Sequence, residues 1–404
     1  MKILLASGRS YPGIGGVENS LRFIGRELIR AGHEVKVFCP QIASDKLVRR
    51  AHEGIDIICF PCKSARWPHA GFLAMAAGAQ LAIRAVLSEF QPDAIWCRSA
   101  PVGLGIRRGG YKGCLIQIFC TNAKMYCRGY FLQTHGLPFM RRLVLLALWP
   151  LTYFILARIE RELASACEAI AFSKNMYRQL LEAVSKRIRS CRVIPPGIDG
   201  GIFSRENGQR YLETIERKYG LLRGEQIILY VGRLASDKNI PMLMDAVTML
   251  KQPKAKLVLV GRGPEEMRLN TYARRIGLSK RVVFAGEHCE MLPGFYAISR
   301  IFVLPTTIES FGFVYLEALS TGTPAIGFAG DGRRVLTATE EIIRDGKTGA
   351  VARTVSASAL AEKIDSIMAL DENNFDSMSR RARQDVRERF SWQRFVAETL
   401  ALSV

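Results

Sequence analysis

The sequence has few cysteines and few prolines, and these shortages exclude several classes of protein. Ten cysteines and 16 prolines in 404 residues are too few for a disulfide scaffold or a proline-rich disordered chain. Cys59 and Cys62 form one CxxC pair, but there is no second pair at zinc-site spacing and no Asp-x-Asp, so no metal site is expected. After Met1 and Lys2 the apolar run ends at Ala6, which is too short for a secretory signal and predicts a first β-strand in a cytoplasmic protein.

Acidic residues are missing from one long segment. Between Ala94 and Ile159 there is no Asp or Glu, against nine Arg or Lys, and the whole chain carries a net charge of +20. Residues 1–200 hold 28 of the 57 basic residues but only 13 of the 37 acidic ones. A field of this sign favours a polyanion, an anionic membrane face or a phosphorylated substrate.

Short apolar runs alternate with helix-length segments along the whole chain, which is typical of parallel sheets covered by helices on both faces. The runs form two series, separated at Val193–Gly201 by the stretch richest in proline and glycine. We therefore expect an α/β protein of two doubly wound, Rossmann-like domains that face a central cleft. The domains are expected at residues 1–195 and 196–388, with a last helix in 389–404 crossing back to the first domain. The expected strands are Lys2–Ala6, Glu34–Cys39, Ile55–Phe60, Ala94–Cys97, Leu115–Cys120 and Ala169–Phe172, then Ile227–Val231, Leu257–Val260, Val282–Ala285, Ile301–Leu304 and Ala325–Phe328.

A glycine-rich loop follows the first expected strand. Gly13, Gly15 and Gly16 lead into a helix expected over Val17–Ala31. A backbone without side chains can approach a phosphate closely, and a helix N-terminus supplies free N–H groups. The spacing matches neither GxGxxG nor a P-loop, so a strand-to-helix turn that binds nothing remains an alternative.

Two cations follow the first strand of the second series. Arg233 comes directly after Gly232, and Lys238 stands five residues later, before the next helix. In a doubly wound sheet, ligands bind beyond the carboxyl ends of the strands, where arginine and lysine suit a phosphate. The alternative is a pair of solvated loop cations.

Two glutamates separated by seven residues follow a later strand. Glu309 precedes Phe311 and Gly312, where a helix is expected to begin, and Glu317 falls within that helix. A carboxylate repels a phosphate but accepts hydrogen bonds from hydroxyl groups, so this pair suits a sugar. The alternative is two surface glutamates near a turn.

These motifs together resemble the family 4 glycosyltransferases of GT-B fold, also called group 1 glycosyl transferases. The likeness runs from Lys2 to Trp392 and is most specific in the second half of the chain. The residues that carry it are Gly15–Glu18, Ser173, the hinge Ile194–Asp199, Gly232-Arg233 with Lys238, Val260–Pro264, Glu309 with Glu317, and Asp345–Gly349. The resemblance implies a nucleotide diphosphate sugar as donor substrate, retaining transfer, no metal and no further cofactor.

The resemblance also implies three catalytic groups. Arg233 and Lys238 would grip the diphosphate and stabilise the negative charge that builds on it as the sugar leaves. Glu309 would hold hydroxyl groups of the transferred sugar.

Five further residues are implied to bind the donor. Gly15 and Gly16 would approach the sugar and its phosphate. Phe311 and Gly312 would offer backbone donors. Glu317 would accept hydrogen bonds from the ribose hydroxyls.

One position departs from the family pattern. Many members carry a histidine just after the strand that corresponds to Leu115–Cys120, where this chain reads Cys120-Thr121-Asn122. His135 is the nearest histidine in sequence but falls in a loop of glycine and proline. Thr121 or Asn122 is the expected replacement for contacting the sugar.

The acid-free segment points to the nature of the acceptor. Leu143–Ala157 is uncharged, lies between Arg142 and Arg158, is interrupted by Pro150 and is shorter than the ~20 residues of a membrane span. It is a core helix, a true membrane span, or a basic, aromatic-rich helix lying on an anionic membrane, and we expect the last of these. The acceptor would then be lipid-linked: a glycolipid, a polyprenyl diphosphate oligosaccharide or a lipopolysaccharide core.

We therefore expect a glycosyltransferase of the hexosyltransferase type in cell-envelope polysaccharide synthesis, cytoplasmic and peripheral on the inner membrane face. Its partners would be the nucleotide sugar, the glycan or lipid-linked acceptor and an anionic membrane surface. Two alternatives remain. One is a catalytically silent binding partner of the same fold, which the missing histidine allows. The other is a GT-B enzyme acting on nucleic acid, although no nucleic-acid-binding motif accompanies the positive charge.

Overall fold

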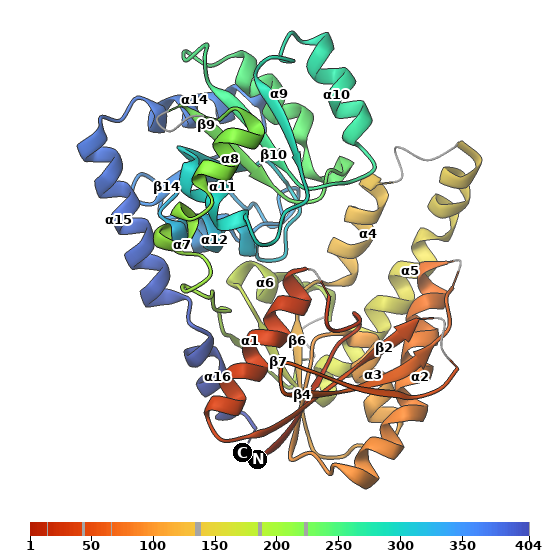
Figure 1. Ribbon diagram of the computed structural model, residues 1–404. Helices are drawn as coiled ribbons and strands as arrows, with labels where there is room; N and C mark the ends of the chain where they lie inside the picture. The colour runs from red at the N-terminus through yellow and green to blue at the C-terminus, as the bar shows by residue number, and fades with distance from the viewer. Residues whose placement is uncertain are drawn as a thin grey trace. The chain divides into compact units, whose positions relative to one another are not determined.

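The computed structural model describes residues 1–13, 15–42, 45–65, 67–133, 139–184, 188–221 and 225–403. His135 therefore lies outside the described residues. The chain divides into two compact units, each built around its own sheet (Figure 1). Unit 1 comprises residues 1–128, 143–197 and 392–404, and unit 2 comprises residues 129–142 and 198–391.

The sheet of unit 1 has eight strands in the order β3-β4-β2-β1-β5-β6-β7-β8. All neighbours are parallel except β3 and β4, which pair antiparallel at one edge. The central strands are buried on both faces, which is why they consist of almost continuous apolar residues. The strands are β1 Lys2–Ala6, β2 Glu34–Ile42, β3 Val48–His52, β4 Ile55–Cys62, β5 Ala94–Cys97, β6 Cys114–Phe119, β7 Glu168–Ala171 and β8 Ser190–Val193.

Seven helices of the described residues accompany this sheet: α1 Gly16–Arg30, α2 Pro68–Glu89, α3 Ala100–Arg108, α4 Ala123–Gln133, α5 Phe139–Ala166, α6 Lys174–Ala183 and α16 Trp392–Leu400. The last of them, α16, packs against α1, where the rings of Phe23 and Trp392 stack at 6.2 Å. The indole N–H of Trp96 on β5 donates to Ser403 Oγ at 3.0 Å. The C-terminal end of the chain thus belongs to the N-terminal unit.

The sheet of unit 2 has six parallel strands in the order β11-β10-β9-β12-β13-β14. Beside this sheet, α9 packs against α14, and α12 packs against both α11 and α15. The strands are β9 Ile227–Val231, β10 Lys256–Val260, β11 Val282–Gly286, β12 Ile301–Leu304, β13 Ala325–Phe328 and β14 Gly349–Ala352. The helices are α7 Arg205–Gln209, α8 Leu212–Tyr219, the short 3-10 helix η2 Ser236–Lys238, α9 Ile240–Thr248, α10 Glu266–Arg275, α11 Leu292–Ile298, α12 Phe313–Thr321, α13 Thr339–Ile342, α14 Ala357–Met368 and α15 Glu372–Arg389.

Both sheets are doubly wound, so the chain order reverses direction at one point in each. In unit 1 the reversal lies between β1 and β5, and in unit 2 it lies between β9 and β12. Loops at the carboxyl ends of strands on either side of such a reversal diverge and leave room for a ligand. The loop with Gly15 and Gly16 follows β1, the loop with Arg233 follows β9, and the loop with Glu309 follows β12.

Three strands and one continuous helix were not expected from the sequence. The edge strands β3 and β8 consist largely of polar, exposed or half-exposed residues, so they lack the apolar run that marks a buried strand. The edge strand β14 is buried, but it has only four residues and most of them are small, Gly349 and Ala350 among them, so its apolar run is weak in the sequence. The interruption expected at Pro150 is wrong, because α5 continues through it from Phe139 to Ala166. The proline removes one backbone donor, but the surrounding leucines favour helix strongly enough to extend it.

Candidate functional site

The loops that follow β9 and β10 run backbone against backbone. A Cβ on Gly261 would meet the carbonyl oxygen of Gly232 at 2.0 Å, and one on Gly263 would meet that of Leu234 at 2.2 Å. Only glycine permits so close an approach at these two positions. This contact fixes the backbone on both sides of Arg233 and therefore the position from which its side chain extends.

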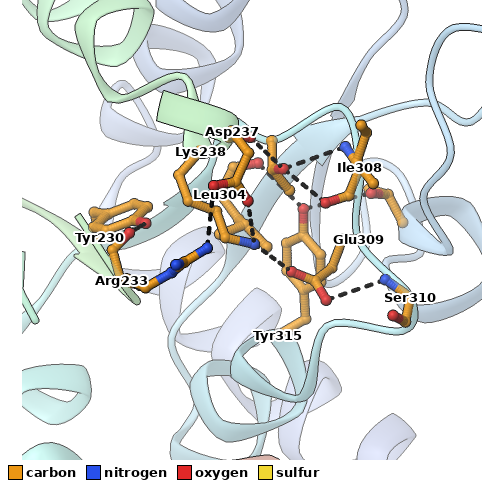
Figure 2. Close-up of polar contacts among 11 residues, drawn as sticks. Tyr230, Arg233, Asp237, Lys238, Leu304, Ile308, Glu309, Ser310 and Tyr315 are labelled. Carbon is orange, nitrogen blue, oxygen red and sulfur yellow. Dashed lines mark hydrogen bonds and ion pairs between the residues drawn. The ribbon is translucent and has the colours of Figure 1, made fainter. Parts of the chain in front are cut away.

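Arg233 and Lys238 converge on the carboxylate of Asp237, as Figure 2 shows. Arg233 Nη2 lies 3.4 Å from Asp237 Oδ1, and Lys238 Nζ lies 3.7 Å from Asp237 Oδ2. Asp237 is nearly buried, whereas half of the Arg233 side chain is exposed. The hydroxyl of Tyr230 donates to the carbonyl oxygen of Arg233 at 3.0 Å and so holds its backbone. Asp237 thus keeps two cations side by side beyond the end of β9.

Lys238 also contacts the carboxylate that follows β12. Its Nζ donates to Glu309 Oε2 at 3.0 Å, while the amide of Ser310 donates to Glu309 Oε1 at 3.1 Å (Figure 2). Burial lowers the pKa of Lys238, but the charges of Glu309 and Asp237 outweigh it, so that the pKa is raised above its usual value. Lys238 therefore stays a cation, with a carboxylate on either side.

A buried threonine joins the two loops that carry this cluster. Thr306 Oγ1 lies 3.1 Å from the carbonyl oxygen of Asp237 and 2.9 Å from that of Ile308. The amide of Glu309 donates to the carbonyl oxygen of Leu336 at 3.0 Å. Hydrogen bonds within unit 2 therefore hold the backbone at Asp237 and at Glu309. The distance between the two loops is set by these bonds to the backbone.

Glu317 lies on α12 and is bound to a buried tyrosine on α11. The hydroxyl of Tyr296 donates to Glu317 Oε2 at 2.8 Å. Burial raises the pKa of Glu317 to about 7, and the hydrogen bond from Tyr296 acts in the opposite direction. Around neutral pH this carboxyl group is therefore close to its titration midpoint.

The helix that carries Glu317 begins with a glycine in the left-handed conformation. Gly312 has a φ of 93°, and a Cβ there would meet the ring of Tyr315 at 2.7 Å. No side chain caps the start of α12. The ring of Phe311 is buried against Phe313 and Phe390, so only its backbone is available to a ligand.

The glycine loop of unit 1 combines an open helix start with a carboxylate. Gly15 is the residue before α1, and Gly16, the first residue of the helix, is exposed. The side chain of Glu18 folds back over the loop, since a Cβ on Gly15 would lie 2.7 Å from Glu18 Oε2. Glu18 was not assigned a role from the sequence. Its carboxylate makes this loop better suited to sugar hydroxyls than to a bare phosphate.

Asn122 is committed to the interior of unit 1, so the expectation that it contacts the sugar is wrong. Its Oδ1 accepts from the amide of Met125 at 2.9 Å, and its Nδ2 donates to Gln179 Oε1 at 3.4 Å. Thr121 remains exposed. Cys120, one residue earlier, lies against the buried guanidinium of Arg98, with Sγ 2.9 Å from Nη2.

Two helices of unit 1 carry exposed apolar residues. On α5 these residues are Leu143, Val144, Leu151, Tyr153 and Phe154, and on α2 they are Leu73 and Leu81. The exposed side of α5 continues with the basic residues Arg158 and Arg161. By length and composition alone, α2 and the Arg142–Ala166 part of α5 are apolar enough to cross a membrane, and 28% and 33% of the apolar 18-residue stretch within each is buried. Helix α5 is therefore not an ordinary core helix over its whole length.

Three of the expected site residues come together within unit 2. Arg233, Lys238 and Glu309 form one cluster through Asp237, and Gly312 and Glu317 lie at the start and in the middle of α12, directly after it. Gly15 and Gly16 belong to unit 1. Within the described residues there is no group of three or more His, Cys, Asp or Glu side chains arranged to hold a metal ion.

Besides Glu18, two residues of the site in unit 2 were given no role from the sequence. Asp237 lies between Arg233 and Lys238. The one hint in the sequence is that this acidic residue directly precedes Lys238. Tyr296 lies within an apolar helix and looks like a core residue. Its hydroxyl acquires a role only once α11 and α12 are packed together.

Sequence models of two families match the chain. The model described as glycosyl transferases group 1 matches residues 213–385, and that of glycosyltransferase family 4 matches residues 14–200. Together they match most of unit 2 and most of unit 1.

Curated relatives carry names of glycosyltransferases. Alpha-monoglucosyldiacylglycerol synthase of Streptococcus pneumoniae is 27% identical over 81% of this chain and 70% of its own length. A GDP-mannose-dependent phosphatidylinositol monomannoside mannosyltransferase of Mycobacterium tuberculosis is 23% identical over 98% of this chain and 96% of its own length. An uncharacterized glycosyltransferase of Methanocaldococcus jannaschii is 27% identical, but the match spans only 59% of that protein.

Solved structures share the fold over the whole chain. Sucrose-phosphate synthase from Thermosynechococcus elongatus superposes with a TM-score of 0.80 at 21% identity, covering 99% of this chain and 98% of that one. Anabaena HepE in complex with UDP-glucose gives a TM-score of 0.72 at 19% identity, covering 99% of both chains. With both units matched by family models and the fold shared throughout, the chain belongs to the group 1, family 4 glycosyltransferases of GT-B fold.

Proposed function

We propose that this protein transfers a sugar from a nucleotide diphosphate sugar to a membrane-associated glycan or lipid-linked acceptor. The observation that carries the proposal is the 3.0 Å contact between Lys238 Nζ and Glu309 Oε2. A cation suited to a diphosphate thus lies beside a carboxylate suited to sugar hydroxyls. That juxtaposition fits a ligand in which a sugar is joined directly to a phosphate.

The donor is held by groups of unit 2 with divided tasks. Arg233 and Lys238 bind the two phosphates, and Glu309 accepts hydrogen bonds from hydroxyl groups of the transferred sugar. Glu317 accepts hydrogen bonds from the ribose, while the backbone of Phe311 and Gly312 donates to the ligand. Among relatives and neighbours, HepE was solved with UDP-glucose and several enzymes are named as GDP-mannose-dependent, which supports a nucleotide sugar as donor.

The reaction needs stabilisation of the leaving group more than it needs a base. As the bond from the sugar to the diphosphate breaks, negative charge grows on the diphosphate, next to the cations Arg233 and Lys238. No metal ion is required for this task, and no further cofactor is proposed. Gly15 and Gly16 of unit 1 are the residues proposed to approach the sugar and its phosphate. We propose that transfer retains the configuration of the sugar, with the leaving phosphate assisting the acceptor on the same face.

The acceptor side is proposed to lie at a membrane surface. The exposed apolar residues of α5 are followed on the same helix by Arg158 and Arg161, a combination suited to the boundary between headgroups and acyl chains. Relatives are named for diacylglycerol-based and phosphatidylinositol-based acceptors, which supports a lipid-linked acceptor for this chain. The enzyme would act at the cytoplasmic face as a peripheral protein, in the synthesis of a cell-envelope glycolipid, polysaccharide or lipopolysaccharide.

Two other functions compete with this proposal. A silent binding partner would keep the fold without needing the cluster around Lys238, so loss of that cluster's charges would leave it unaffected. An enzyme acting on nucleic acid would bind DNA or RNA through the basic unit 1 and transfer sugar to it. The first is tested by donor turnover, and the second by replacing the lipid acceptor with duplex DNA and single-stranded RNA.

The decisive experiment joins donor binding to transfer. The purified protein is screened by thermal shift against UDP-, GDP- and ADP-sugars in the presence of EDTA, where a donor at 100 times its Kd should stabilise by ~2.7 kcal/mol. The stabilising donor, carrying a radiolabelled sugar, is then offered to vesicles of diacylglycerol, phosphatidylinositol or polyprenyl phosphate. Label in the organic phase supports the proposal, and its absence with every donor and acceptor in the presence of EDTA and of added Mg²⁺ or Mn²⁺ contradicts it.

A further inference from the structure

The carboxylate of Glu317 is oriented by a single hydroxyl group. Tyr296 donates its hydrogen bond to Oε2 at 2.8 Å, and among the described residues this is the one side chain with a hydrogen bond to that carboxylate. Tyr296 is fully buried on α11, whereas Glu317 on α12 is partly exposed. One oxygen of the carboxylate thus faces the interior and the other remains for a ligand.

The tyrosine ring is held so that its hydroxyl has little freedom. It packs edge-on against Phe302, with ring centroids 5.7 Å apart, and against Phe203 at 6.2 Å. The carbonyl oxygen of Tyr296 accepts from Thr323 Oγ1 at 2.7 Å, which anchors the end of α11 to the loop after α12. A rigid donor of this kind sets both the rotation and the position of the carboxylate that it binds.

We propose that Tyr296 is a positioning residue for the donor: its hydroxyl holds the Glu317 carboxylate in the orientation that receives the neighbouring hydroxyl groups of the ribose. This inference rests on the proposed function, because it takes the nucleotide as the ligand of Glu317. Tyr296 itself touches no ligand and acts through Glu317.

The hydrogen bond from Tyr296 also affects the protonation of Glu317. Burial raises the pKa of Glu317 to about 7, the Tyr296 hydroxyl opposes this rise, and no charged side chain of the described residues contributes to the shift. Without the hydroxyl, the carboxyl group would be protonated over a wider range of pH. A protonated carboxyl group has fewer lone pairs to offer to ribose hydroxyls.

The test is a cycle of two changes, one in the protein and one in the ligand. UDP, GDP and ADP, each with its 2′,3′-dideoxy counterpart, are titrated calorimetrically into the wild-type protein and into Tyr296→Phe at pH 7.5. The matched control is Tyr219→Phe, which removes a hydroxyl that donates to the Ala285 carbonyl oxygen at 3.0 Å in the same unit. Melting temperatures of all three proteins are compared so that a loss of folding is recognised.

In the wild-type protein, the tightest ribonucleotide should bind about tenfold more tightly than its dideoxy form, as for a hydrogen bond to a charged group. In Tyr296→Phe the affinity for the ribonucleotide should fall about tenfold and that for the dideoxy form less than threefold, so that the preference falls from about tenfold to less than about threefold. Tyr219→Phe should keep the preference. Binding with an unchanged preference in Tyr296→Phe overturns this inference and leaves the proposed function standing. Absence of nucleotide binding to the wild-type protein overturns both.

Discussion

The ammonium group of Lys238 and the carboxylate of Glu309 form an ion pair of 3.0 Å between two loops that are 71 positions apart in sequence. Lys238 also lies 3.7 Å from the carboxylate of Asp237, so the lysine has two anionic partners. In the proposed function, a diphosphate that approaches Lys238 would replace Glu309 as its anion and leave Glu309 to accept from hydroxyl groups. This exchange of partners would couple phosphate binding to sugar recognition.

Removing either member of the pair should abolish most of the transfer activity. Lys238→Ala loses charge stabilisation of the leaving diphosphate, and Glu309→Gln loses a charged acceptor for the sugar hydroxyls. Each should lower kcat/KM by about 10²-fold or more, the usual cost of removing one electrostatic group from a transition state. Steady-state kinetics with the donor found by thermal shift measures this.

The matched control is Lys256→Ala. Lys256 pairs with Glu225 at 2.8 Å, at the start of β10 and so at the opposite end of the sheet. It should change kcat/KM by less than about twofold, as expected of a partly exposed ion pair. Lys238→Ala or Glu309→Gln with near-normal rates and normal melting temperatures contradicts the assignment of the diphosphate and sugar contacts.

Donor binding should strengthen as the pH rises through about 7. The pKa of Glu317 is raised to that value by burial, so the carboxyl group is mostly protonated at pH 6 and mostly ionised at pH 8. Only the ionised form accepts fully from both ribose hydroxyls, and we expect an increase in affinity of about tenfold across this interval. Calorimetric titration of the nucleoside diphosphate at half-unit steps from pH 5.5 to 8.5 measures it.

The nucleotide's own terminal phosphate also titrates in this range, so the comparison is made with Glu317→Gln. That variant shares the titration of the ligand but has no carboxyl group at this position. The ratio of the two affinities should rise with pH, and a constant ratio contradicts the role given to Glu317.

Glu160 should make unit 1 less stable as the pH rises. It is buried on α5, its Oε2 accepts no hydrogen bond from the described residues, and burial raises its pKa to about 8. The folded state therefore binds more protons than the unfolded state between the unfolded pKa and about 8, and the stability that this provides is lost as the pH rises through that range. Glu160→Gln removes the dependence.

The melting temperature of Glu160→Gln relative to the wild-type protein should thus increase from pH 5 to pH 9. At ~1.4 kcal/mol per pH unit as an upper bound, and 2–4 °C per kcal/mol for a unit of about 200 residues, the change should reach several degrees. Glu162→Gln is the control, since Glu162 on the same helix is half exposed and pairs with Arg108 at 3.0 Å. A difference that does not vary with pH contradicts the buried, proton-binding state of Glu160.

The fold was predictable because its strands are buried on both faces. β9 Ile227–Val231 and β12 Ile301–Leu304 are uninterrupted apolar runs, and their limits match the sequence-based prediction. β3 was missed because this edge strand is exposed along almost its whole length and its sequence, Val48–His52, is mostly polar. An apolar run reports burial, so the exposed strand β3 escapes it, whereas the more apolar edge strand β11 was predicted.

The site was predictable only where chemistry shows in the residue type. Lys238 and Glu309 stood out as charged residues in the connections that follow apolar strands, before the next helix. Tyr296 did not, since its ring is a core residue and its hydroxyl gains a partner through the packing of two helices. Asn122 was misjudged for the same reason: its amide binds Met125 and Gln179, and that pairing follows from the tertiary structure.

The exposed face of α5 should bind anionic membranes peripherally. Tyr153 and Phe154 are 40% and 56% exposed, and Leu151 beside them is 45% exposed. Aromatic side chains at the headgroup level add apolar contact, and each nearby basic residue adds ~1 kcal/mol that salt screens over ~10 Å at 0.1 M. Binding should therefore require both anionic lipid and the apolar face.

Co-flotation with vesicles of increasing phosphatidylglycerol content measures this binding, at 50 mM and 500 mM salt. Tyr153→Ser with Phe154→Ser should abolish flotation, and Arg158→Glu with Arg161→Glu should weaken flotation on anionic vesicles. Met267→Ser is the control, because Met267 is an apolar side chain of unit 2 that is 81% exposed and far from α5 in sequence. Flotation that is equal on neutral and anionic vesicles, or that resists high salt, contradicts peripheral electrostatic docking, and the second result points instead to insertion of α5 into the bilayer. Flotation on neither kind of vesicle leaves the exposed apolar residues of α5 to a contact other than lipid and removes the membrane from the proposed function.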